Sequence, residues 1–99
     1  MLIKLGVSIE RLSPQTRRIL NIVDAEYEVY GSEAVITSTY EGNHRPGSLH
    51  YQDDAIDFRR TPDINSIAKN LRVKLSDDYD VVIEVDHLHV EYDPKEVKG

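Results

Sequence analysis

Two segments of this chain have the apolar spacing of an α-helix, and each follows a Ser-Pro or Thr-Pro start. Ser13-Pro14 precedes the first and Thr61-Pro62 the second. A Ser or Thr N-cap followed by proline is typical of helix starts. Apolar residues then recur every three or four positions, at Ile19, Leu20, Val23, Tyr27 and Tyr30 up to a stop at Gly31, and at Ile64, Ile67, Ala68, Leu71 and Leu75. We therefore predict two helices, each with one apolar face that must be covered.

Short runs rich in β-branched residues fill most of the remaining chain. We predict strands over 34–37, 55–59, 80–86 and 88–92. The run 55–59 alternates, with Ile56 and Phe58 on one face and Asp57 on the other. No repeat or linker divides the 99 residues. The order predicts a single small α+β domain over 1–99, with two helices packed on a small antiparallel or mixed sheet.

Composition excludes several classes of function. Lys and Arg number 12 against 18 Asp and Glu, for a formal charge of −6. This charge disfavours nucleic acid and anionic membranes as partners. There is no cysteine, so a metal must bind to His, Asp or Glu. The chain has neither a signal-peptide pattern nor an apolar run of about 20 residues. We expect a soluble monomer that is cytoplasmic when synthesised.

The four histidines lie in two short stretches that also contain acids. His44 and His50 fall in a long patternless segment, 38–54, and loops of this length usually have a function. His87 and His89 share one face of an extended segment. A catalytic zinc needs three N or O ligands. His50 and Asp57 can supply two of them, and either His87 or His89 can supply the third.

A carboxylate beside such a metal can accept a proton from the bound water, and both Asp86 and Glu84 are candidates. In an unbroken strand, Asp86 and His89 would face opposite sides. We therefore predict a bulge or a tight turn near His87. The competing interpretation is that the histidines are solvated polar residues of a structural protein.

Two separated motifs resemble the signature of the M15-type zinc D-alanyl-D-alanine carboxypeptidases. They are Ser48-Leu49-His50-Tyr51 with Ala55-Ile56-Asp57, and Asp86-His87-Leu88-His89. This family includes phage endolysin peptidases and the hedgehog signalling domain. The likeness covers about 36–92 and is stronger to the phage and hedgehog members than to the longer carboxypeptidases.

The resemblance implies one Zn²⁺ per chain, with His50, Asp57 and His89 as ligands. It implies Asp86 as the general base and His87 as the residue that supports the oxyanion. It also implies that Ser48 braces the loop and that His44 lies near the metal. Arg45, in the same loop, is a candidate for positioning the substrate.

The resemblance implies a peptidase that acts on peptidoglycan stem peptides. The longer carboxypeptidases carry an arginine, which holds the substrate's terminal carboxylate, where this chain has Glu41. A carboxylate repels that terminus, so endopeptidase activity is as good an expectation as carboxypeptidase activity. Such an enzyme acts on the cell wall after release, as phage lysis enzymes do. The alternative is a catalytically inactive, hedgehog-like metal-binding module that recognises another protein.

Overall fold

The computed structural model describes residues 1–39 and 54–94, whose strands form one mixed five-stranded sheet. The strands are β1 (Leu2–Ile3), β2 (Val35–Ser38), β3 (Ala55–Arg59), β4 (Tyr79–Ile83) and β5 (His87–Tyr92). Their order across the sheet is β1-β2-β3-β5-β4. The β1–β2 pair is parallel and the other three pairs are antiparallel.

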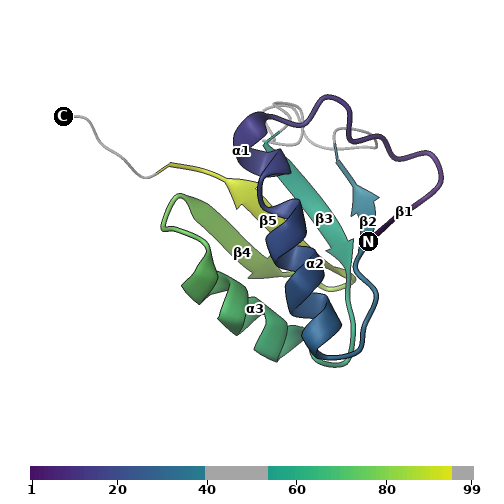
Figure 1. Cartoon of the computed structure of the whole chain (residues 1–99), viewed down its shortest axis with the longest axis vertical. Helices are drawn as coiled ribbons and strands as arrows, with labels where there is room; N and C mark the ends of the chain where they lie inside the picture. Colours follow the sequence, from purple (N-terminus) through teal and green to yellow (C-terminus); the bar gives the residue numbers. More distant parts are fainter. Residues whose placement is uncertain (40–53, 95–99) are drawn as a thin grey trace.

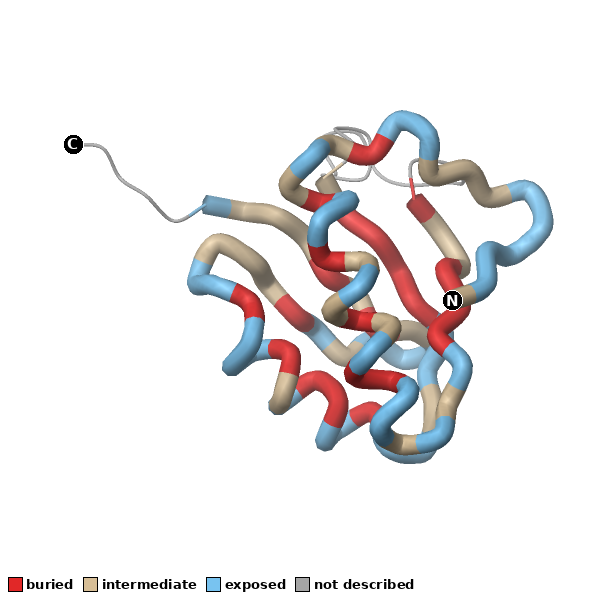
Figure 2. Tube along the Cα trace, viewed as in Figure 1, coloured by how far each residue is buried: buried red, intermediate tan, exposed pale blue. Residues whose placement is uncertain are grey.

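Two helices, α2 (Leu20–Val29) and α3 (Ile64–Lys74), lie on the same face of this sheet (Figure 1). Buried apolar side chains from the helices and strands form the core between the two layers. They include Ile19, Val23, Tyr27, Ile67, Leu71, Ile56, Phe58, Leu88 and Val90. Figure 2 shows buried positions recurring along both helices and almost without a break along β3. The predicted α+β fold, with two helices on a mixed sheet, is confirmed.

The first predicted helix is interrupted. A short helix, α1 (Pro14–Arg17), precedes α2, and a turn at residues 18–19 separates them. The N-cap prediction is confirmed, since the Ser13 hydroxyl accepts a hydrogen bond from the Thr16 N–H. The Ile19 N–H bonds to the Thr16 carbonyl, three residues back, which tightens the backbone. Ile19 remains buried, so apolar spacing alone does not reveal the interruption.

The second predicted helix begins later than its Thr-Pro start suggests. The first residue of α3 is Ile64, and its N-cap, Asp63, makes no side-chain capping hydrogen bond. The Ile64 N–H bonds instead to the Thr61 carbonyl, which closes a turn around Pro62. The backbone angle that proline imposes suits both the first turn of a helix and a tight turn. The Thr61-Pro62 pair is therefore compatible with either structure.

The strand predicted over 80–86 is shorter in the structure. It ends at Ile83, and a tight turn through Val85 and Asp86 leads into β5. The Glu84 N–H donates a hydrogen bond to the His87 carbonyl across this turn. The prediction of a bulge or a tight turn near His87 is therefore confirmed, in the form of a turn.

The long loop predicted over 38–54 falls largely outside the described residues. Within the described part of the chain, no helix is long and apolar enough to cross a membrane.

Candidate metal centre

One face of the sheet carries the candidate site. Along β5, Leu88 and Val90 point into the core beneath the helices. His87 and His89 alternate with them, so they lie on the opposite face. Asp57 lies directly across from His89 in the β3–β5 pairing, and side chains at directly opposed positions share a face. The backbone therefore brings Asp57 and both histidines together on the side of the sheet away from the helices.

The side chains of Asp57, His87 and His89 converge on one point. Each offers one ligand atom, and these three atoms all lie within 4.8 Å of one another. Asp57 Oδ1 is 2.8 Å from His89 Nδ1, and Asp57 Oδ2 is 3.5 Å from His87 Nε2. Asp57 is buried and the histidines are partly buried. This group can hold a metal ion.

The outward nitrogen of each histidine contacts a further carboxylate. His89 Nε2 lies 2.6 Å from Glu91 Oε1, and His87 Nδ1 lies 2.6 Å from Asp86 Oδ1. Histidines that bind metals generally give their second nitrogen to a carboxylate or carbonyl, which fixes the ring orientation. Both histidines of this group have that arrangement.

Without a metal, the ring of His89 lies between two carboxylates. Burial opposes protonation of the ring, but the hydrogen bonds and charges of Asp57 and Glu91 outweigh it and raise the pKa of His89 to about 9. A proton on His89 then occupies the position that a cation would take, because both respond to the same negative charge.

Zinc is one of the ions that accept a donor set of this kind. Two imidazole nitrogens and one carboxylate leave a fourth position for water, as catalytic zinc sites do. Ligand atoms of a tetrahedral site lie about 3.4 Å apart when the bonds are near 2.1 Å. The 3.5 Å between Asp57 Oδ2 and His87 Nε2 has this spacing. The 2.8 Å between Asp57 Oδ1 and His89 Nδ1 is a hydrogen-bond distance, so these two side chains would move apart slightly to bind an ion together. Other divalent transition metals accept the same ligands.

Asp86 lies in the turn between β4 and β5, at the rim of the group. Its side chain is 85% exposed and contacts the group through His87. The hydrogen bond from His87 holds the pKa of Asp86 below its usual range. The turn itself is fixed by Arg60, whose Nη1 donates to the carbonyls of Glu84 at 3.0 Å and Val85 at 3.1 Å.

A register shift in the sheet lies next to Asp57. Ile36 pairs with Phe58, but Ser38, two residues on, pairs with Asp57. The extra residue makes a bulge in β2, and the Thr37 hydroxyl donates to the Asp57 carbonyl at 3.3 Å. Bulges change the direction of side chains and are frequent beside functional sites.

The sequence-based site is only partly within the described residues. Asp57, His87 and His89 come together, and Asp86 adjoins them through His87. The remaining candidates, His44, Arg45, Ser48 and His50, lie outside the described residues.

No role for Glu91 or Arg60 was predicted from the sequence. The signal for Glu91 was present, because residues two apart on a strand share a face. Arg60 had no such signal, since its contacts with Glu84 and Val85 join segments 24 and 25 residues away.

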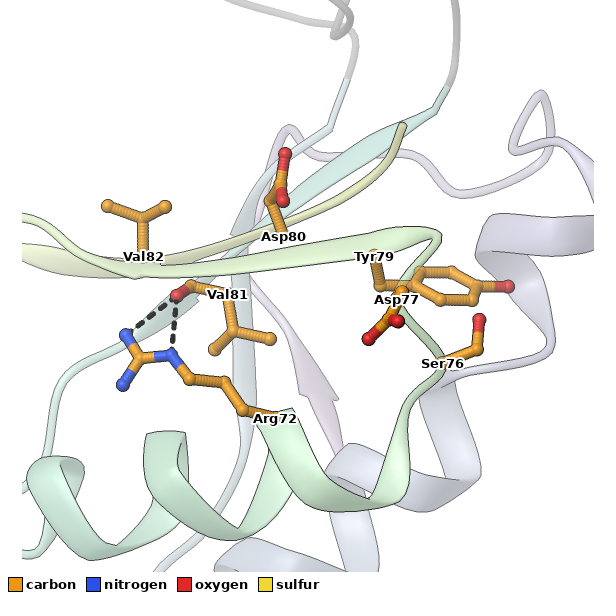
Figure 3. A pocket seen from close by; sticks show the side chains of 7 residues that line it. All are labelled: Arg72, Ser76, Asp77, Tyr79, Asp80, Val81 and Val82. Carbon is orange, nitrogen blue, oxygen red and sulfur yellow. Dashed lines mark hydrogen bonds between the residues drawn. The ribbon is translucent and has the colours of Figure 1, made fainter. Parts of the chain in front are cut away.

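A pocket of about 510 Å³ lies elsewhere, where the end of α3 meets β4 (Figure 3). It is lined by Arg72, Ser76, Asp77, Tyr79, Asp80, Val81 and Val82. The Arg72 guanidinium donates two hydrogen bonds to the Val81 carbonyl, at 3.0 and 2.7 Å. These hydrogen bonds satisfy one carbonyl of β4, which is an edge strand of the sheet. The pocket shares no residue with the Asp57 group.

The chain was compared with models of protein families, with curated proteins and with solved structures, and none of them matches it.

Proposed function

We propose that this protein is a zinc-dependent peptidase that hydrolyses peptide bonds in peptidoglycan stem peptides. One observation supports it most: Asp57, His87 and His89 present three ligand atoms to one point, and both histidines are backed by carboxylates. The substrate class comes from the resemblance to the M15-type peptidases. Either carboxypeptidase or endopeptidase cleavage agrees with this group.

The metal would be held by Asp57 and His89, together with a nitrogen from His50, as the resemblance implies, or from His87. When bound, zinc activates a water molecule and polarises the carbonyl of the bond to be cut. With two neutral imidazoles and one carboxylate as its ligands, a bound Zn²⁺ would keep a net positive charge, which is what lowers the pKa of water at such an ion.

The residues around the ion would move the proton and hold the substrate. Asp86, whose pKa is lowered by His87, is ionised at neutral pH and is proposed to accept the proton of the attacking water. If His50 is the third ligand, His87 would be free to support the developing oxyanion. In the same proposal, Ser48 braces the loop, and His44 and Arg45 position the substrate.

A metal-dependent recognition module without turnover is the second candidate. The contact of 2.6 Å between Asp86 and His87 favours it, because an orienting partner of His87 need not act as a base. The two candidates predict different effects of replacing Asp86 with a neutral residue, because only in the peptidase does Asp86 take part in turnover.

The test uses the full chain loaded with zinc and purified cell wall, with release of free amines as the readout. Asp86→Asn should keep zinc and the fold but lose about 10²- to 10⁴-fold in kcat, the range for a general base. Glu84→Gln removes the same charge from the same turn and replaces the other candidate base. The proposal predicts that its turnover stays near wild type.

Release of amines by wild type and loss in Asp86→Asn alone would support the peptidase. Zinc-loaded wild type that releases no amines from any wall type would contradict the peptidase and favour the recognition module. Equal kcat for Asp86→Asn and wild type would remove Asp86 from the mechanism.

A further inference from the structure

Glu91 is joined to the metal group through His89. Its Oε1 lies 2.6 Å from His89 Nε2, while the other ring nitrogen, Nδ1, lies 2.8 Å from Asp57. The two carboxylates thus contact opposite ends of the ring. Because Asp57 belongs to the metal group, the nitrogen that faces the metal is Nδ1. Nε2 therefore faces Glu91.

This arrangement decides which nitrogen carries the proton. A neutral imidazole has one N–H and one lone pair, and only the lone pair can bind a metal. Glu91 Oε1, 2.6 Å from Nε2, accepts a hydrogen bond from Nε2–H, and this contact favours the tautomer with the lone pair on Nδ1. It also increases the electron density of the ring, and hence its strength as a ligand.

The fold holds this contact more firmly than the corresponding contact of His87. Residues 89 and 91 share a face of β5, and that strand is paired on both sides, with β3 and β4. The Glu91 side chain is 21% exposed, whereas Asp86, the partner of His87, is 85% exposed and lies in a turn. Water competes less for a partly buried acceptor on a central strand than for an exposed acceptor in a turn.

We propose that Glu91 is a positioning residue of the metal centre, which holds His89 with Nδ1 directed at the ion. This inference rests on the metal centre of the proposed function and extends it to a residue with no other assigned role.

The experiment measures zinc affinity by competition with a chromophoric chelator, and the visible spectrum of the Co²⁺-substituted protein. Glu91→Ala should bind zinc about 10- to 100-fold more weakly than wild type. Glu91→Gln should lose less, because its amide oxygen still accepts a hydrogen bond from Nε2–H. The Co²⁺ spectrum should change in Glu91→Ala, since the ring of His89 is no longer fixed.

Asp54→Asn is the matched control. Asp54 immediately precedes β3, whose Ala55 pairs with Glu91, and its replacement removes one negative charge from the same sheet. It should leave zinc affinity within a few-fold of wild type and the Co²⁺ spectrum unchanged. Thermal unfolding checks that each variant folds, and Glu91→Gln keeps the test informative if Glu91→Ala does not.

Three results would overturn the inference. Glu91→Gln and Glu91→Ala could bind zinc as tightly as wild type. Alternatively, Asp54→Asn could weaken binding as much as Glu91→Ala, which would assign the effect to net charge. In both of these cases wild type binds zinc, so the metal centre stands. Wild type that binds no zinc would overturn the metal centre together with the inference.

Discussion

Asp57 on β3 lies directly opposite His89 on β5, and the carboxylate and the imidazole meet at 2.8 Å. The residues are 32 positions apart in the chain, and the antiparallel register places them on one face. Neighbouring strands of a sheet hold directly opposed side chains close together, so this pair is fixed by backbone hydrogen bonds. His87, two residues from His89, completes the group.

Removing either member of this pair should abolish stoichiometric zinc binding. Asp57→Ala and His89→Ala each delete one ligand, whereas the protein purified without chelator should contain about one zinc per chain. Elemental analysis checks the ratio. Zinc at 100 times its Kd should also raise the free energy of unfolding by about 2.7 kcal/mol, measured with and without chelator. Full retention of zinc by His89→Ala would contradict the assignment.

The third ligand can be identified by comparing two further variants. If His50 supplies it, as the resemblance implies, His50→Ala should lose zinc and His87→Ala should keep it. If His87 supplies it, as the convergence of the described side chains permits, the outcome is reversed. Zinc content and the Co²⁺ spectrum distinguish the two. Retention of zinc at wild-type affinity by both variants would show that neither histidine is a ligand.

Arg60 should influence turnover through the turn that carries Asp86. Arg60→Ala removes the hydrogen bonds to the carbonyls of Glu84 and Val85. Displacing a proton acceptor reduces kcat more than substrate affinity, so we expect kcat to fall by about 10- to 100-fold with KM and zinc content little changed.

Steady-state kinetics on a defined stem peptide measure the Arg60 effect. Lys69→Ala, on the exposed side of α3, is the control for loss of a positive charge. Unchanged kcat in Arg60→Ala would show that the turn keeps its position without the guanidinium.

Glu26 should make stability depend on pH in the acid range. Its buried carboxylate accepts hydrogen bonds from Lys74 and Asn70, both at 2.7 Å, and these link α2 to α3. Burial acts to raise the pKa of Glu26, but these partners outweigh it and hold the pKa below its ordinary value of 4.5. A carboxylate with a lowered pKa stabilises the folded state above its unfolded value, and this contribution is lost as the pH falls through the folded value.

Urea unfolding as a function of pH tests this dependence. Wild type should lose stability as the pH falls below about 4.5, and Glu26→Gln should show a flatter curve over that range. Glu28→Gln, at an exposed position of the same helix, should follow wild type. Parallel curves for Glu26→Gln and wild type would contradict the proposed role of this carboxylate.

Local patterns were sufficient to predict the fold class and the faces of the elements. Apolar spacing located the segments that form α2 and α3, because the residues that a helix buries against the sheet recur every three or four positions in the sequence. Alternation along 87–91 placed both histidines on one face for the same kind of reason. The limits of the elements were less well predicted, since the turns at 18–19 and 62–63 keep the apolar residues on the expected side.

The sequence by itself determined which residues have metal-binding chemistry and which strand face each occupies. The tertiary structure decided which strands are neighbours. The β3–β5 pairing puts Asp57 opposite His89, and the hydrogen bonds from Arg60 hold the turn that carries Asp86. Periodicity shows only which face of each segment is buried. Which strands pair with one another depends on how the five described strands pack with α2 and α3. The roles of Glu91 and Arg60 follow from that packing.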